Sequence, residues 1–261
     1  MSTTRVQMEP AFAPSARPGD ARVTWLIARR AALESLRDRM TLAFNALFAL
    51  LVPFLVVWLV VRPQTADHGG KTGAALGIVI ATYMLVVGLM PSSGAIGIAS
   101  GVFAGEKEQG NLAPLLATPA SNRAIFGGKV LGAVLPAFLY AAIAEVCYLS
   151  GVALLVGVDK LRLLPAAQSL AMLALVPSYA VLGAAVASLI SSRVRTYQSA
   201  QTLSSLALFP IMGALFALAF AMQTWGAWLL LVAVIAVVAV DALLIVVSAA
   251  TWRREEVMAH R

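Results

Sequence analysis

Long apolar stretches, separated by short polar segments, form the dominant pattern of the chain. A bilayer core about 30 Å thick is crossed by about 20 helical residues, and six stretches reach that length. They are residues 41–61, 73–101, 128–157, 167–190, 200–222 and 226–250. A transmembrane barrel would instead show short segments of alternating apolar and polar residues. The pattern therefore predicts an all-α integral membrane protein with six transmembrane helices, which together form one domain over residues 41–252.

The segment before the first apolar stretch is polar and rich in arginine. Residues 1–19 contain three prolines among scattered polar residues and are predicted to be disordered. Asp20 is a suitable N-cap, and residues 20–40 are predicted to form an amphipathic elbow helix at the membrane interface. The apolar stripe of this helix comprises Trp25, Leu26, Leu33, Leu36 and Met40, and the charged residues of interest are Arg29, Arg30, Arg37, Asp38 and Arg39. A charged flank that only anchors the first span is the alternative interpretation.

The positions of lysine and arginine predict the orientation of the spans. Arginines are concentrated before the first span and after the last, so the positive-inside rule places both termini in the cytoplasm. The connections between spans two and three and between spans four and five then also lie in the cytoplasm. The basic residues in these two connections and at their edges are Lys107, Arg123, Lys129, Arg193 and Arg195. Residues 253–261 are expected to form a short cytoplasmic tail.

The composition agrees with this interpretation and argues against nucleic-acid binding. Of the 261 residues, 61% are hydrophobic and 12% are charged, and the formal net charge is +7. We attribute this charge to membrane topology and to contact with anionic lipid in the bilayer. A nucleic-acid-binding protein would carry a basic patch with stacking aromatics on a soluble surface. The abundance of alanine and arginine is associated with bacteria of high GC content, so the predicted location is the bacterial inner membrane, as a multi-pass protein.

The chain carries no recognisable nucleotide-binding motif. The GGKT sequence at 69–72 ends like a phosphate-binding loop, but Thr65 occupies the place of the first glycine of that motif. The GGKV sequence at 127–130 has Arg123 at that glycine position, and Val130 in place of the serine or threonine that would bind magnesium. We therefore expect that the chain itself is not an enzyme and holds neither a cofactor nor a metal.

Two acidic residues lie inside predicted spans, Glu145 in the third and Asp241 in the sixth. A charge at the centre of a bilayer costs roughly 2.5–3.5 kcal/mol on insertion scales, so each side chain is expected to face protein or water, or to be protonated. The simpler interpretation is an interhelical hydrogen bond made by a neutral acid. The alternative is a proton or cation relay.

The sequence FAGEKEQGNLAPLLATP at 103–119 interrupts the apolar pattern between spans two and three. Leu112, Leu115 and Leu116 have the i, i+3, i+4 spacing of an apolar helix face, and Pro119 ends that helix. The pattern predicts a short amphipathic helix beneath the membrane, which suits docking into a partner's groove. A solvated loop is the alternative, although a plain loop gains nothing from exposing three leucines.

This segment resembles the corresponding part of ABC (ATP-binding cassette) type-2 transporter permeases. Those proteins carry a glutamate-basic-glutamate cluster, a glycine, a leucine-rich turn, a threonine-proline pair, and a glycine-lysine pair that opens the next span. The matching residues are Glu106, Lys107, Glu108, Gly110, Leu112, Leu115, Leu116, Thr118, Pro119, Gly128 and Lys129. In addition, the arginine-aspartate-arginine sequence at 37–39 resembles permeases of the branch that extrudes drugs or sodium.

The resemblance implies a six-helix permease that forms a homodimer, or pairs with a second permease, on two separately encoded ATPase subunits. ATP and magnesium would bind to those subunits, and residues 105–120 would act as the coupling helix. The substrate would move out of the cytoplasm or the inner leaflet. Two alternatives from the residues alone are a membrane docking or assembly partner that does not transport and, less favoured, a secondary transporter that uses Glu145 and Asp241.

Overall fold

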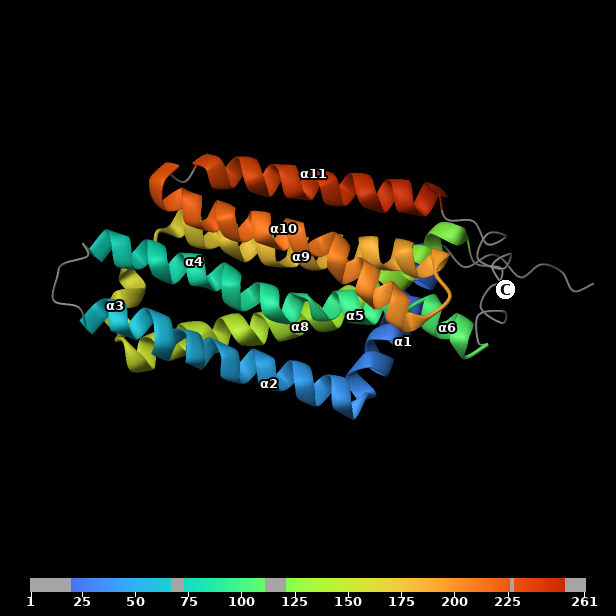
Figure 1. Ribbon diagram of the computed structural model, residues 1–261, viewed down its shortest axis with the longest axis horizontal. Coiled ribbons are helices and arrows are strands. Elements are labelled where there is room, and N and C mark those ends of the chain that lie inside the picture. The colour runs from blue at the N-terminus through green and yellow to red at the C-terminus, as the bar shows by residue number, and fades with distance from the viewer. Residues whose placement is uncertain (1–19, 67–72, 111–120, 226–227, 252–261) are drawn as a thin grey trace, which may run out of the picture.

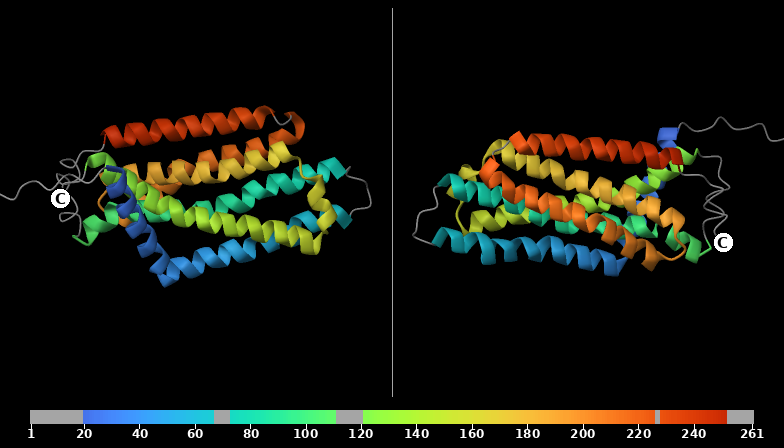
Figure 2. Two further views of the ribbon diagram at one scale, coloured as in Figure 1. Left: turned by 180° about the vertical axis from the view of Figure 1, so that it is seen from behind. Right: turned by 45° about the horizontal axis from the view of Figure 1, so that its top comes forward.

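The computed structural model describes residues 20–66, 73–110, 121–225 and 228–251. In these residues the chain forms helices and no strands, which confirms the all-α fold class. Most of the helices lie along the long axis of an elongated bundle (Figure 1). Asp20 and Thr251, the first and last of the described residues, lie at the end of the bundle that also holds α6 (Ala104–Glu108), which is called the α6 end below (Figures 1 and 2).

Among the described residues, five helical segments are long and apolar enough to cross a membrane: Leu42–Thr65, Gly73–Glu108, Arg123–Leu155, Ala166–Arg193 and Tyr197–Ala221. The helices that form them are α2 (Arg39–Val56), the π-helical turn η1 (Val57–Val61), α3 (Arg62–Ala66), α4 (Gly73–Ser92), α5 (Gly94–Gly101), α6, α8 (Asn122–Leu155), α9 (Ala166–Arg193) and α10 (Tyr197–Trp225). The last helix, α11 (Trp228–Thr251), runs beside them (Figure 1) and contains the shorter apolar segment Leu231–Val247. A count of six spans and the cytoplasmic location of both termini therefore remain predictions.

The core of the bundle lies where α4, α8 and α9 contact one another. Large side chains are fully buried there, among them Tyr148, Leu85 and Leu175. The Tyr148 hydroxyl donates a hydrogen bond of 3.0 Å to the carbonyl of Ile80, so α8 is also joined to α4 by a polar contact. In contrast, only 22% of the most apolar part of α2 and of α10 is buried, against 61% for α4 and α9. Thus α2 and α10 lie at the periphery and present apolar side chains outward.

The first helix, α1 (Asp20–Arg37), slants across the α6 end of the bundle and then turns at Asp38 into α2 (Figure 2). It packs on α8 through small residues. A Cβ atom placed at Gly132 would lie 2.5 Å from the Cβ atom of Ala31, and one placed at Gly128 would lie 2.8 Å from that of Ile27. The two glycines therefore permit a close approach that larger residues would prevent.

The apolar stripe predicted for this helix does not face the bundle. Trp25, Leu26, Leu33 and Met40 are exposed, and only Leu36 packs against the core. The helix extends over Asp20–Arg37, whereas the elbow helix was predicted over residues 20–40. The domain limits at 1–19 and 253–261 fall on or beside residues outside the described ranges.

The structure refines two predicted segments. The stretch predicted over 73–101 lies within the apolar segment Gly73–Glu108, and the helix breaks at Ser93, between α4 and α5. Pro91, which has no N–H, precedes this break and weakens the helical hydrogen bonding there. After the first predicted span, Arg62–Ala66 is helical, while 67–72 lie outside the described residues. The connection from α8 to α9 contains a short 3-10 helix, η2 (Val158–Leu163).

Candidate functional site

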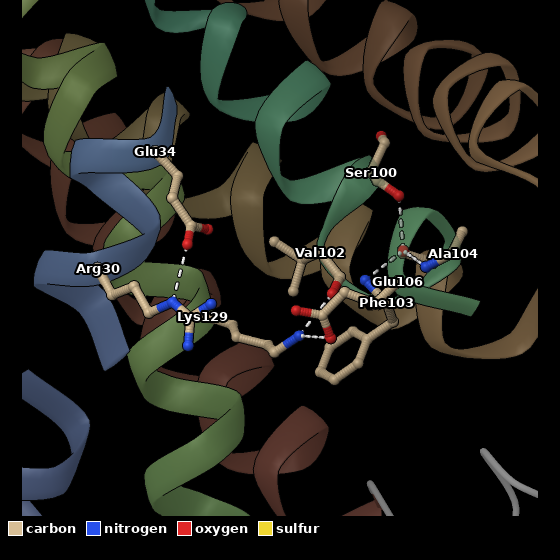
Figure 3. A network of polar contacts seen from close by, with 9 residues as sticks. Arg30, Glu34, Ser100, Val102, Phe103, Ala104, Glu106 and Lys129 are labelled. Atoms are coloured by element: carbon tan, nitrogen blue, oxygen red, sulfur yellow. Dashed lines mark hydrogen bonds and ion pairs between the residues drawn. The ribbon is translucent and has the colours of Figure 1, made fainter. Parts of the chain in front are cut away.

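Polar side chains from three helices converge on the turn between α5 and α6, formed by Val102 and Phe103. The turn leads from the second apolar segment to the cluster of Glu106, Lys107 and Glu108. Figure 3 shows this turn beside Lys129 of α8 and the charged pair of α1. Residues on α8 and α9 satisfy the polar groups that the turn exposes, as described below.

Ser191, in the last turn of α9, fixes the turn from one side. Its hydroxyl donates a hydrogen bond of 2.6 Å to the carbonyl of Ser100. The same oxygen accepts hydrogen bonds from the backbone N–H groups of Ala104, at 2.8 Å, and Phe103, at 3.2 Å. The first N–H groups of a helix have no partner within the helix, so Ser191 supplies for α6 a cap that comes from another helix. Ser191 is completely buried, so its hydroxyl is closed to solvent.

Lys129, on α8, fixes the turn from the other side. Its ammonium group donates a hydrogen bond of 2.6 Å to the carbonyl of Val102 and forms an ion pair with the carboxylate of Glu106. It also lies 4.6 Å from the centre of the Phe103 ring, which stacks in turn on Phe126. Lys129 is only 4% exposed. A charge that is buried to this degree is stable only when it is paired and hydrogen-bonded, so the position of Lys129 depends on the turn and the turn depends on Lys129.

Lys107 joins α6 to the end of α9. Its ammonium group donates hydrogen bonds to the carbonyls of Ser192, at 2.7 Å, and Val194, at 3.2 Å. The last carbonyls of a helix lack partners and carry partial negative charge, so a lysine here caps α9 and complements its dipole. Through Lys107 and Ser191, α6 is attached to α9 at two points.

The charged residues of α1 lie next to this cluster. Arg30 and Glu34 form an ion pair of 2.8 Å along one face of α1, beside Lys129 (Figure 3). The hydrogen bond that Arg30 donates to the carboxylate of Glu34 raises the pKa of Arg30, so the guanidinium stays charged. Both side chains are exposed, and such a pair contributes little to stability. Arg29 and Arg37 are also exposed, and they form no hydrogen bond or ion pair with other described residues.

The structure brings together some of the residues predicted from the sequence. Glu106 and Lys107 both have partners within the chain, whereas Glu108 is exposed. Gly110 has a φ of +72°, a conformation that favours glycine, and it follows the end of α6 at Glu108. The remaining predicted coupling residues lie outside the described residues, so their amphipathic helix stays a prediction; they are Leu112, Leu115, Leu116, Thr118 and Pro119.

Sequence reasoning missed Ser191 and the role of Phe103. Lys129 was identified only as part of the glycine-lysine pair that opens the next span. The available signals were weak: a lysine inside an apolar segment, and two serines directly before Arg193 at the end of another. Ser121 caps α8, since its hydroxyl accepts a hydrogen bond of 3.1 Å from the N–H of Ala124.

The two intramembrane acids lie elsewhere in the bundle. Glu145 is 5% exposed, and its Oε1 lies against Gly88 of α4, where an added Cβ atom would be only 2.7 Å away. Neither carboxyl oxygen of Glu145, nor Oδ1 of Asp241, has a hydrogen-bond partner among the described residues. The interhelical hydrogen bond expected for Glu145 is therefore not formed in this part of the structure. Within the same residues, no group of acidic, histidine and cysteine side chains is arranged to hold a metal ion.

Comparison with known protein families identifies the family of this chain. The family described as ABC-2 type transporter matches residues 22–214, which extend from α1 into α10. The chain belongs to this family. Because of this membership, the chain is a transporter permease and a multi-pass membrane protein. The family supplies the transmembrane component of the transporter, not the ATPase. A search of curated proteins found no match. Permeases of this family generally pair with an ATP-binding-cassette ATPase. Assignment to the branch that extrudes drugs or sodium stays a prediction.

Proposed function

We propose that this ABC-2 permease is the membrane subunit of an exporter that couples to a separate ATPase through the connection between α6 and α8. The observation that carries the proposal is the attachment of α6 to α8 and α9 by Lys129, Ser191 and Lys107. A segment that only connects two spans does not need buried polar contacts to two other helices. A segment that transmits movement from a soluble partner does need them.

In the proposed mechanism, ATP binding draws two ATPase subunits together and shifts residues 111–120. That shift reaches α6 directly, because only Gln109 and Gly110 separate the end of α6 from the segment. Separating Lys129 from Glu106 would leave a buried charge unpaired, at a cost of about 3–5 kcal/mol. It is therefore easier for α6 to move together with α8 and α9 than to move alone. ATP binding then favours one arrangement of the spans over another.

The proposal includes a dimer of permeases on two ATPase subunits, with ATP and magnesium held by the latter. The outward apolar surfaces of α2 and α10 support it, since each presents several large exposed side chains to lipid or to a second permease. The substrate would leave the cytoplasm or the inner leaflet along this dimer. Homodimer formation and outward transport belong to the proposal.

The experiment that tests coupling is co-purification of the full chain with the ATPase encoded beside it. The variant L115E/L116E places two charges on the predicted docking face and should abolish co-purification. Val158→Glu is a matched control, because Val158 is an apolar residue that is 66% exposed in η2, on the connection from α8 to α9 at the opposite end. Undiminished co-purification of the double variant would overturn the proposed coupling.

A further inference from the structure

The outward face of α1 presents arginines and leucines in alternation. Leu26, Arg29, Arg30, Leu33, Glu34 and Arg37 follow the spacing of a single helix face and line an open hollow of about 450 Å³. The opposite face of α1 is the one that packs on Gly128 and Gly132 of α8. In the described part of the chain, the side chains of the outward face are exposed.

We propose that this face binds the headgroup of an anionic phospholipid in the leaflet next to α1. Three arginines and one glutamate line the hollow, so its net charge is positive and complements a phosphate. Glu34 pairs with Arg30, which leaves Arg29 and Arg37 as guanidinium groups without partners in the described part of the chain. Leu26 and Leu33, between them, provide apolar surface for the start of an acyl chain.

The depth of α1 supports a lipid as the ligand. Arg37 precedes Leu42, the first residue of the apolar segment, by five residues, which is about 8 Å along a helix. The headgroup layer on each side of the hydrocarbon core is roughly 5–8 Å thick, so Arg37 lies at its level. From Arg37, α1 leads across the end of the bundle (Figure 2).

The surroundings of the hollow favour lipid over a protein partner. Trp25, 55% exposed, lies beside it, and tryptophan is enriched at the level of lipid headgroups. The exposed apolar residues continue through Met40 into Phe44 and Leu47 of α2, which must face lipid or another span. The face is thus continuous with the membrane-facing surface. The proposal is independent of the coupling role of α6.

The test uses the full chain in neutral detergent, incubated with equal amounts of phosphatidylglycerol and phosphatidylcholine that carry identical acyl chains. Native mass spectrometry then counts the lipids retained on each chain. The wild-type chain should retain more phosphatidylglycerol than phosphatidylcholine. In R29Q/R37Q the ratio of the two retained lipids should fall about 25-fold, because each arginine contributes about five-fold. The control R193Q/R195Q removes the same charge at the same end, from exposed arginines, and should change the preference less than two-fold.

Several outcomes would overturn the proposal. One is equal loss in R29Q/R37Q and in the control, which would mean that only net charge matters. Another is full displacement of phosphatidylglycerol by excess inorganic phosphate, which would identify a phosphate site without lipid specificity. A third is loss of ATPase co-purification in R29Q/R37Q with the lipid preference unchanged, which would assign the face to the ATPase. If R29Q/R37Q misfolds, the wild-type chain still decides, because its preference must fall as salt rises.

Discussion

Replacement of Ser191 by alanine tests the arrangement of the α5–α6 turn directly. The substitution removes the acceptor of two backbone N–H groups and the donor to the carbonyl of Ser100, all at a position closed to water. Each of the two unsatisfied buried donors costs about 1–3 kcal/mol, or about 2–6 kcal/mol together. Partial relaxation of the turn offsets some of this cost, so we expect Ser191→Ala to lower the free energy of unfolding by about 2–4 kcal/mol.

A matched control lies on the same helix. Ser178 donates one hydrogen bond of 3.1 Å to the carbonyl of Ala174, four residues earlier, and serves no other helix. Bonds of this local kind contribute little to helix stability, so Ser178→Ala should change the free energy of unfolding by less than about 1 kcal/mol. Both variants are compared by denaturant unfolding in the same detergent.

Amide hydrogen exchange gives a second readout of the same prediction. In Ser191→Ala the amides of Phe103 and Ala104 lose their acceptor and should exchange faster, while those in the middle of α4 should not change. Equal stabilities for the two serine variants, together with unchanged exchange at Phe103 and Ala104, would refute the account of this turn.

Three other substitutions have clear expectations. Two are measured as the free energy of unfolding in detergent, and Gly132→Leu is measured by protease digestion. Lys129→Met leaves the carbonyl of Val102 without its donor and Glu106, whose side chain is 35% exposed, without its ion pair; it should cost about 1–3 kcal/mol, part of which the double variant with Glu106→Gln should restore, and a neutral Lys129→Met would contradict these contacts. Gly132→Leu should push α1 away from α8 and expose α1 to protease. The control is Gly105→Ala, whose added Cβ meets nothing within 4 Å and which should leave the digestion unchanged. Similar digestion of both variants would contradict the close contact between α1 and α8. Glu145→Leu removes a buried carboxyl that has no hydrogen-bond partner among the described residues and should stabilise the chain by about 1–3 kcal/mol, so a loss of stability would contradict this prediction.

The fold class and the helical segments could be predicted because lipid requires every backbone polar group to be satisfied within the chain. Long apolar runs therefore have one solution, a helix, and their limits follow the charged residues around them. The break at Ser93 could not be read with the same ease, because Pro91 was its only sign and prolines within other helices, such as Pro136 in α8, do not break them.

The contacts of α1 and of the candidate site depend on tertiary structure. The leucine stripe of α1 was the stronger sequence signal, yet alanines make its contact with α8, since small residues give no periodic signal of their own. Glu106 and Lys129 are far apart along the chain, and only the approach of α6 to α8 pairs them. The resemblance to ABC-2 permeases located Glu106 and Lys107 in the right segment, but their partners on α8 and α9 came from the structure.

The most direct test of the proposed function is the composition of the complex that the full chain forms when it is expressed with its neighbouring genes. We expect native mass spectrometry to find two permease chains with two ATPase subunits, and to find permease without ATPase for L115E/L116E. A wild-type chain that purifies without any ATPase, or a double variant that retains it, would contradict coupling through the segment between α6 and α8.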